Sequence, residues 1–231
     1  MSGILYGIGV GPGDPELMTL RAVRAIKESD VIALPRADKD KCRAYQIALP
    51  VVPELKYKKI ISCEFSMVKD EDTLAKLHRE FYQKYKQLLL DGYNLAFLTI
   101  GDPTIYSTFG YIMKYAKADG IEVEIVNGIT SFCGTAAASN IVISEKDENI
   151  HILSGQGNID EELKLPGTKV IMKSGRNISA IKEKLMAMEA EGKVSVHAVI
   201  DCGMETEQIF SSAMTIPDDV KYMMTIIVKD L

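Results

Sequence analysis

Short apolar runs that end at a glycine-containing turn and lead into a helix-like pattern constrain the fold of this chain more than any other feature. Such runs occupy residues 4–10 and 95–100, and a further strand-like run at 30–34 follows the first helical pattern. Two strands joined by a helix form a βαβ unit, which places both strands parallel in one sheet. The sequence therefore predicts an α/β fold.

The first helix is expected to run from Pro15 through Lys27. Asp14 is a favoured N-cap residue, and proline suits the first helical position. The residues that recur at helical spacing, and so are expected to form the buried face, are Leu17, Leu20, Val23 and Ile26.

Two further helices are expected in the first half, one at 72–91 and one directly after Pro103. The second is expected to bury Ile105, Phe109, Ile112 and Ala116. Residues 36–71 give no clear pattern, because prolines and charges interrupt them. The run at 121–126 alternates apolar and acidic residues, which is typical of a strand near the edge of a sheet.

The α/β pattern begins again in the second half. A helix is predicted at 178–191, and strands are predicted at 150–154, 168–173, 194–200 and 223–228. No Gly-, Ser- or Pro-rich linker separates the halves. Because the α/β pattern begins again after residue 127, we expect two α/β domains, residues 1–127 and 128–231.

Composition excludes several classes of protein. The 27 basic and 32 acidic residues give a net charge of −5, which disfavours binding to nucleic acid through bulk charge. The four cysteines and three histidines are scattered, so neither a zinc site nor a disulfide framework is expected. There is no signal-peptide pattern and no apolar run of membrane-spanning length. These features favour a soluble intracellular protein with free thiols and without a metal.

The glycine cluster at 7–13 raises the question of a dinucleotide site, because glycines between a strand and a helix can cradle a pyrophosphate. Three features oppose this interpretation. The spacing is GxGxGPG rather than GxGxxG, and Pro12 lacks an N–H donor. Asp14 and Glu16 would repel the phosphates, and Asp30 precedes the second strand instead of ending it. A nicotinamide-dependent dehydrogenase is disfavoured.

Two more strand-to-helix corners follow, Gly101-Asp102-Pro103 and Asn127-Gly128. Ligands of open α/β sheets bind at the carboxyl ends of the strands, where these corners are expected to lie. The alternative for the first corner is a simple turn in which Asp102 caps the next helix.

The corners occur in a recognisable order: GVGPGDPELMTLRAVRAIKESDVI at 9–32, LTIGDPTIYST at 98–108 and EIVNGITSF at 124–132. With VIMKSGRN at 170–177 and YMMTIIVKD at 222–230, they resemble the tetrapyrrole methylases, which are S-adenosylmethionine-dependent methyltransferases of the cobalamin and sirohaem pathways. CEFSM at 63–67, GDPTIYSTF and the closing strand resemble one branch, the precorrin-2 or cobalt-factor II C20-methyltransferases.

The resemblance implies a two-domain α/β fold of the tetrapyrrole methylase type, with the active site in the cleft between the domains and S-adenosylmethionine bound there. S-adenosylhomocysteine would be the product. It also implies a cytoplasmic homodimer with a tetrapyrrole substrate. The positions that the resemblance assigns to the cofactor are Pro12, Gly101, Asp102, Ile105, Tyr106, Thr130, Ser131, Met172 and Gly203.

This chain departs from the family pattern at two places. Asn127 stands where the family usually has proline, which would loosen the hinge between the halves. Ser174-Gly175 replaces a bulkier pair after the strand that carries Met172, which would change the edge of the cofactor pocket.

The implied reaction moves a methyl group from a sulfonium to carbon 20 of the macrocycle, so positioning is the main contribution of the protein. A general base can then remove the proton from carbon 20, and the nearest candidates are Asp14, Asp102 and Tyr106. The substrate carries many carboxylates. The loop residues Arg36, Lys39, Lys41 and Arg43 either bind these carboxylates or form a solvated loop balanced by Asp38 and Asp40.

Two alternative functions stay open beside the C20-methyltransferase. One is another methyltransferase of the same family, acting on uroporphyrinogen-III or precorrin-4. The other is a tetrapyrrole-binding protein without catalytic activity.

Overall fold

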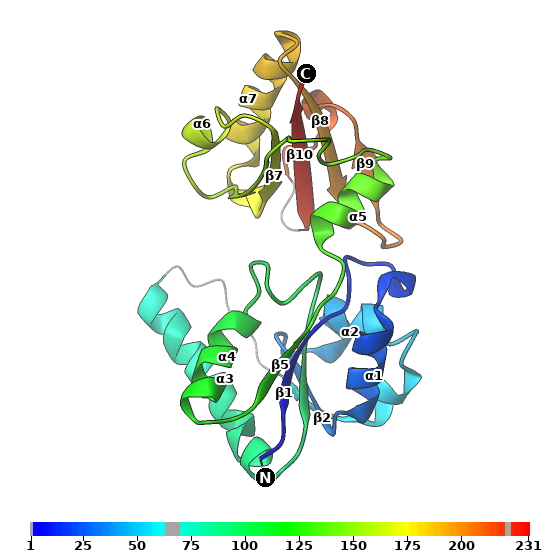
Figure 1. Ribbon diagram of the computed structural model, residues 1–231, viewed down its shortest axis with the longest axis vertical. Coiled ribbons are helices and arrows are strands. Elements are labelled where there is room, and N and C mark those ends of the chain that lie inside the picture. Colours follow the sequence, from blue (N-terminus) through cyan, green and yellow to red (C-terminus); the bar gives the residue numbers. More distant parts are fainter. Residues whose placement is uncertain (1, 63–69, 220–222) are drawn as a thin grey trace. The chain divides into compact units, whose positions relative to one another are not determined.

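The computed structural model describes residues 2–62, 70–219 and 223–231 (Figure 1). The chain divides into two compact units, Met1–Thr130 and Ser131–Leu231, which we call unit 1 and unit 2. The motif CEFSM at 63–67, which supports the assignment to one branch of the family, lies outside the described residues.

Unit 1 contains a five-stranded sheet in the order β3-β2-β4-β1-β5. Every pair of neighbouring strands is parallel, so the carboxyl ends of all five strands lie at one edge. The strands are β1 (Leu5–Gly9), β2 (Val31–Leu34), β3 (Lys59–Ser62), β4 (Leu95–Thr99) and β5 (Val123–Val126). The predicted α/β fold is confirmed, and the strand at 121–126 is indeed at an edge.

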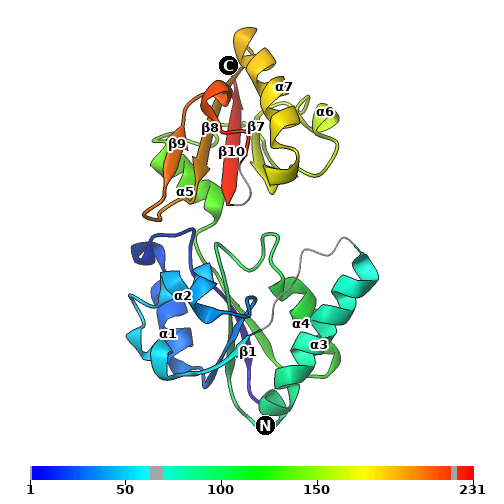
Figure 2. The same ribbon diagram turned by 180° about the vertical axis from the view of Figure 1, so that it is seen from behind.

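Helices cover both faces of this sheet. Figures 1 and 2 show α1 (Leu20–Glu28) and α2 (Arg43–Ala48) on one face, and α3 (Glu71–Leu90) and α4 (Phe109–Ala118) on the other. Successive side chains of a strand point to opposite faces. The residues that pack against α3 and α4 accordingly alternate along the strands and include Leu5, Val31, Ala33, Leu95 and Phe97.

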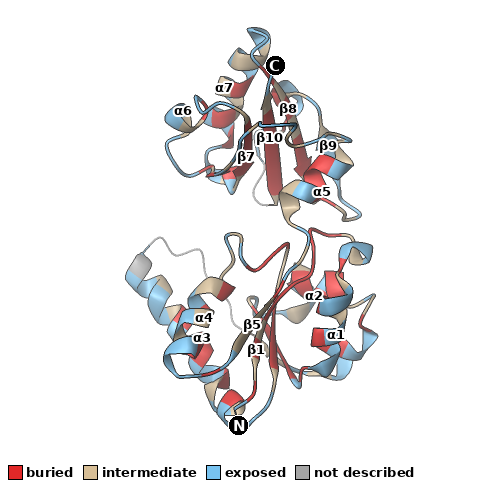
Figure 3. Ribbon diagram, viewed as in Figure 1, coloured by how far each residue is buried: buried red, intermediate tan, exposed pale blue. Residues whose placement is uncertain are grey.

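Unit 2 contains a mixed sheet in the order β6-β7-β10-β8-β9, in which only β6 and β7 are parallel. One face packs against α7 (Ile178–Ala190), and the other packs against α5 (Ser131–Ala138). A short helix, α6 (Ile159–Glu162), follows β6. The strands are β6 (Ile150–Ser154), β7 (Thr168–Met172), β8 (Val194–Ile200), β9 (Gln208–Phe210) and β10 (Met224–Asp230). Figure 3 shows that β7, β10 and β8 carry most of the buried residues of this sheet.

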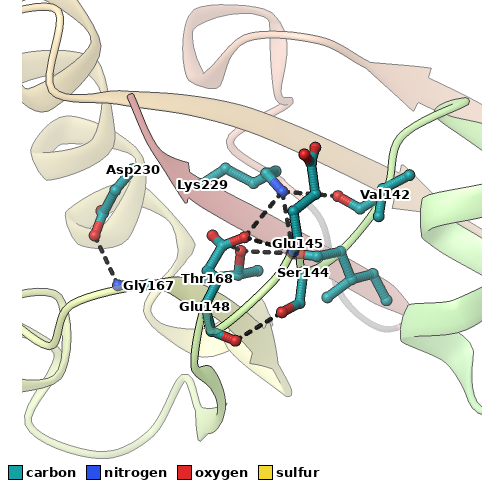
Figure 4. Close-up of polar contacts among 9 residues, drawn as sticks. Val142, Ser144, Glu145, Glu148, Gly167, Thr168, Lys229 and Asp230 are labelled. Atoms are coloured by element: carbon teal, nitrogen blue, oxygen red, sulfur yellow. Dashed lines mark hydrogen bonds and ion pairs between the residues drawn. The ribbon is translucent and has the colours of Figure 1, made fainter.

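A segment of unit 2 between α5 and β6, residues 140–149, is tied to the sheet by polar contacts, and we call it the strap (Figure 4). The Lys229 ammonium donates to the carbonyl of Val142 at 2.8 Å and lies 3.4 Å from the Glu148 carboxylate. The hydroxyl oxygen of Thr168 lies 2.7 Å from the other oxygen of Glu148 and 2.7 Å from the carbonyl oxygen of Ile143, and its single proton is shared between these two acceptors. These contacts fasten the strap to β7 and β10.

The first helix begins later than its sequence pattern predicts. Asp14 does cap the Pro15 turn, accepting a hydrogen bond from the N–H of Glu16, but that turn is a short 3-10 helix that ends at Leu17. Thr19 then caps α1, whose buried residues are Ala22, Ala25 and Ile26. Leu17 is 38% and Leu20 is 90% exposed, so the predicted face is wrong at these two positions, whereas Ile26 is buried as predicted.

The helix expected directly after Pro103 also begins later, at Phe109. Ile105 lies in the preceding loop, while Phe109, Ile112 and Ala116 are buried as predicted. The sequence pattern missed β9 and did not resolve residues 36–71, which contain α2, β3 and two 3-10 helices, Lys39–Lys41 and Pro53–Tyr57.

Candidate functional site

The carboxyl edge of the unit 1 sheet contains a topological switch point between β1 and β4. The connection after β1 leads to α1 on one face of the sheet, and the connection after β4 leads to α4 on the other (Figure 1). Loops that diverge in this way leave room for a ligand between them in open α/β sheets. The loops that meet here are the segments after β1 and β4 and the turn after β5.

Glycines bring these segments into direct backbone contact. Gly11 and Gly101 bond to each other in both directions, at 2.8 and 3.3 Å, and both have positive φ (80° and 67°), which a side chain would disfavour. A Cβ on Gly9 would collide with the carbonyl oxygen of Gly101 and lie 2.7 Å from the nitrogen of Gly128. The glycines at this edge are therefore required by the close approach of three backbone segments.

Asp102 lies at the centre of the site and is only 6% exposed. One carboxylate oxygen accepts hydrogen bonds from the N–H (2.8 Å) and the hydroxyl (2.5 Å) of Thr104. The other accepts from the side-chain amide of Asn127 at 2.9 Å and from the N–H of Gly128 at 3.1 Å. The interpretation of Asp102 as the cap of the next helix is wrong, because α4 begins at Phe109, whose N–H binds the Ser107 hydroxyl.

The ionisation of Asp102 reflects two opposing effects. Burial raises the pKa of this carboxyl, but the hydrogen bonds from Thr104, Asn127 and Gly128 favour the charged form and together hold the pKa below its ordinary value. Asp102 is therefore a buried carboxylate at neutral pH.

Asn127 is held on two sides. Besides the bond from its amide to Asp102, its carbonyl accepts a hydrogen bond of 3.3 Å from the hydroxyl of Thr19, the cap of α1. These bonds hold Asn127 within unit 1, and the loosening of the hinge between the halves stays a prediction. No local pattern indicates the pairing between Asn127 and Asp102, since the two residues are 25 positions apart.

The other predicted residues of unit 1 lie along the same edge. Pro12 is buried in the loop after β1, and Asp14 accepts one hydrogen bond from Glu16. Ile105 and Tyr106 follow Asp102 in the loop after β4, and Tyr106 is 43% exposed with a φ of 48°. Thr130 is the last residue of unit 1.

The basic loop after β2 belongs to this edge too. Arg36 is exposed, Lys39 lies 5.8 Å from the centre of the Tyr45 ring, and Arg43 begins α2. Lys41 pairs with Asp38 at 3.5 Å, as the solvated-loop interpretation expects. The structure thus brings Arg36, Lys39 and Arg43 to the edge that carries Asp102.

In unit 2, strand register brings three predicted residues to one edge of the sheet. Met172 pairs with Thr225, and the hydroxyl of Thr225 donates to the Ser131 hydroxyl at 3.1 Å. The neighbouring pair of Met224 and Ile200 places the loop of Gly203 at the same edge. Gly203 has a φ of 73°, and its N–H donates to the Glu207 carboxylate. Sequence reasoning missed Thr225.

Ser174 follows Met172 at this edge and is 1% exposed. A Cβ on Gly155 would lie only 2.7 Å from the Cα of Ser174. The side-chain amide of Asn177 donates to the carbonyl of Gly155. Glycine at position 155 therefore lets the loops after β6 and β7 approach closely.

The histidines do not gather at either edge. His78 is 3% exposed and stacks on Tyr111 with ring centres 4.6 Å apart, so it is packed against α4. Among residues 2–62, 70–219 and 223–231, no group of three or more His, Cys, Asp or Glu side chains is placed to hold a metal ion. Within those same ranges, no helix has the length and apolar character needed to span a membrane.

Comparison with known proteins gives a consistent result. The family model described as Tetrapyrrole (Corrin/Porphyrin) Methylases matches residues 4–216. A relative from Methanocaldococcus jannaschii, named "Probable cobalt-precorrin-2 C(20)-methyltransferase", is 38% identical over 184 residues, covering 78% of this chain and 77% of the relative.

Solved structures share the fold at lower identity. A cobalt precorrin-4 methyltransferase superposes with a TM-score of 0.75 at 17% identity, covering 98% of this chain and 94% of the other. A uroporphyrin-III C-methyltransferase from Thermus thermophilus in complex with S-adenosylhomocysteine has a TM-score of 0.67 at 20% identity, with coverage of 98% and 97%.

Proposed function

The chain belongs to the tetrapyrrole (corrin/porphyrin) methylase family, and from this premise we propose that it transfers a methyl group from S-adenosylmethionine to carbon 20 of precorrin-2 or cobalt-factor II in cobalamin biosynthesis. The observation that carries the proposal is the 38% identity, over most of both chains, to a relative named for this reaction. The likeness to solved methyltransferases supports the fold on which the reaction takes place.

The residues at the carboxyl edge of unit 1 fit a cofactor of this kind. Close packing of Gly9, Gly101 and Gly128 leaves backbone groups, rather than side chains, at the switch point. Backbone N–H and C=O groups can bind the amino acid and ribose parts of a nucleoside ligand without added charge. The absence of a pyrophosphate in such a ligand also agrees with the acidic Asp14 and Glu16 beside the first loop.

We therefore propose that the chain holds S-adenosylmethionine through the positions predicted in unit 1, namely Pro12, Gly101, the backbone of Asp102, Ile105, Tyr106 and Thr130. Ser131, Met172 and Gly203 of unit 2 are proposed contacts on the basis of the resemblance alone. The bound sulfonium supplies an activated methyl group, so the residues of the chain contribute mainly by holding the reacting atoms in line. Such positioning is worth about 7–11 kcal/mol.

Arg36, Lys39 and Arg43 are the proposed partners of the substrate carboxylates, since they lie at the same sheet edge as the proposed cofactor loop. Guanidinium groups bind carboxylates with two parallel hydrogen bonds, which fixes orientation as well as position. Asp14 and Tyr106 are the proposed candidates for accepting the proton from carbon 20; Asp102 has another role, argued below.

The other expectations from the resemblance are kept as proposals: a homodimer in the cytoplasm, with domains at 1–127 and 128–231. Light scattering on the purified chain tests the first, with an expected mass of twice the 25.5 kDa of one chain.

The activity itself is tested by anaerobic incubation with methyl-labelled S-adenosylmethionine and, in separate reactions, metal-free precorrin-2, cobalt-factor II, uroporphyrinogen-III or precorrin-4. Label at carbon 20 of one product supports the proposal and shows which macrocycle is used. Label only in products from uroporphyrinogen-III or precorrin-4 would assign another step. Cofactor binding without transfer to any of the four would favour a non-catalytic tetrapyrrole-binding protein.

Replacing Arg36 tests the proposed carboxylate partners. Arg36→Ala is expected to raise the KM for the tetrapyrrole about tenfold, because a charge-assisted hydrogen bond contributes roughly 1.5–3 kcal/mol. The Kd for S-adenosylhomocysteine should stay within about twofold. Lys41→Ala is the matched control, because Lys41 already pairs with Asp38. Equal KM values for the Arg36 variant and the wild type would show that Arg36 does not bind the substrate and would favour a solvated loop.

A further inference from the structure

The carboxylate of Asp102 has no acceptor position left for a ligand. An ionised carboxylate offers about four lone-pair sites. In this chain, four donors from Thr104, Asn127 and Gly128 occupy them at 2.5–3.1 Å. A general base must reach the proton that it removes, and it loses basicity when donors stabilise its charged form. Both conditions disfavour proton transfer to Asp102.

The same four bonds join segments that are distant in the chain. Thr104 belongs to the loop after β4, and Asn127 and Gly128 form the turn after β5. Asn127 extends the connection to a third segment, because its carbonyl accepts the Thr19 hydroxyl at the start of α1. The buried charge of Asp102 is thus the point at which the loops around the switch point are fastened together.

We propose that Asp102 is a positioning residue rather than the proton acceptor. We also propose that the Asn127 side chain, by its hydrogen bond to Asp102, fixes the position of the cofactor loop. The assignment rests on the proposed function, since it treats the loop of Gly101 as the cofactor loop. Asn127 acts without touching the cofactor.

The packing around Gly101 explains why one hydrogen bond matters for binding. The carbonyl of Gly101 is wedged between Gly9 and Gly128, so the loop cannot shift without moving the turn after β5. The bond from Asn127 to Asp102 holds that turn against the loop. Small misplacements of a binding group weaken its ligand contacts steeply, and an error of about 1 Å can cost on the order of 100-fold in rate.

The test measures the Kd for S-adenosylhomocysteine by calorimetry, at a temperature where every variant is folded. Asn127→Ala removes the amide donor and is expected to weaken binding about tenfold. Asn127→Asp keeps the shape but places a second carboxylate against Asp102, and at neutral pH it is expected to weaken binding further. The KM for the tetrapyrrole should change by less than about threefold in both variants, because Asn127 positions the cofactor loop and not the proposed substrate loop.

Asn94→Ala is the matched control. The Asn94 side chain accepts a hydrogen bond of 2.9 Å from the N–H of Ile4 at the opposite, amino edge of the same sheet. Its removal is expected to lower the melting temperature but to leave the Kd within about twofold of the wild type, as expected for a bond that supports only the fold.

Asp102→Asn separates positioning from proton transfer. If Asp102 positions the cofactor loop, the Kd for S-adenosylhomocysteine should rise by a larger factor than kcat falls, with kcat measured at saturating concentrations of both substrates. A proton acceptor predicts the reverse, with kcat falling by about 100-fold or more at unchanged Kd.

The outcomes distinguish this proposal from the proposed function. A wild-type chain that does not bind S-adenosylhomocysteine refutes the proposed function, and the assignment falls with it. A wild-type chain that binds, with the same Kd in both Asn127 variants, overturns the assignment alone. A large fall in kcat for Asp102→Asn at unchanged Kd, which is the result expected for a proton acceptor, also overturns the assignment.

Discussion

Two glycines of unit 1 differ sharply in the space around them, and this difference gives a prediction at the scale of single residues. A Cβ on Gly128 would collide with the carbonyl of Gly101 and lie 2.8 Å from the carbonyl carbon of Gly9, whereas a Cβ on Gly110 in α4 would meet nothing within 4 Å. Gly128→Ala is therefore expected to lower the free energy of unfolding by about 1–3 kcal/mol. Gly110→Ala is expected to raise it by about 0.5–1 kcal/mol, because alanine favours the helix.

Urea unfolding measures both glycine variants against the wild type. If Gly128→Ala were as stable as the wild type, the three loops would not be in the close contact that we describe.

A second residue-scale prediction concerns pH. Burial lowers the pKa of His78 below its ordinary value of 6.5, and burial also lowers that of His197. The unfolded chain therefore binds protons more readily than the folded chain, and stability is lost as the pH falls through 6.5 toward the folded pKa. His78→Phe keeps an aromatic ring against Tyr111 but cannot bind a proton. We therefore expect this variant to lose less free energy of unfolding than the wild type between pH 7 and pH 5, where one pKa unit corresponds to about 1.4 kcal/mol.

Chemical denaturation at several pH values measures this slope. Parallel curves for His78→Phe and the wild type would show that His78 does not contribute. Carboxylates such as Asp102, whose pKa is lowered in the folded chain, also stabilise the fold, but this stabilisation is lost only at more acidic pH.

At the scale of elements, the strap of unit 2 (residues 140–149) shows how a segment without regular structure is fixed to a sheet (Figure 4). The hydrogen bond from Thr168 opposes burial and, with the bonds from the N–H of Glu145 and from Lys229, holds the pKa of Glu148 below its ordinary range. Glu148→Ala is expected to lower the free energy of unfolding by about 1–3 kcal/mol, because it removes the carboxylate that accepts from Thr168, Lys229 and the N–H of Glu145.

Hydrogen exchange should localise the effect of Glu148→Ala to the strap and to β7. Lys164→Ala is the matched control, because the ion pair of Lys164 and Glu161 is 67% exposed on both sides and is expected to contribute less than about 1 kcal/mol. Equal losses in both variants would mean that the network adds nothing beyond surface charge pairing.

At the scale of the whole molecule, ligand binding links the proposed function to stability. A ligand that binds only the folded chain stabilises it by about 2.7 kcal/mol at 100 times its Kd. For a chain of this size we expect S-adenosylhomocysteine to raise the melting temperature by roughly 5–10 °C. NAD at the same concentration is expected to produce no shift, because Asp14 and Glu16 lie beside the first loop. A shift with NAD alone would favour the dinucleotide site that the sequence argues against.

The sequence by itself determined the order and type of most elements. The helices at 72–91 and 178–191 and most of the strands were predictable because periods of 3.6 and 2 are written in the local order of residues. The family was predictable too, since its motifs are contiguous stretches of sequence, and the match over residues 4–216 confirms it. The α/β fold class followed from the same pattern.

Only the tertiary structure decided where α1 and α4 begin and what Asp102 binds. The apolar spacing of Leu17 and Leu20 continues that of α1, but Thr19 caps the helix while its hydroxyl bonds to Asn127, 108 positions away. Asp102 resembles a helix cap in sequence, yet it binds donors on the turn after β5. Local patterns record propensity, whereas the partner of a buried polar group is chosen by which distant segments the folded sheet brings within about 3 Å.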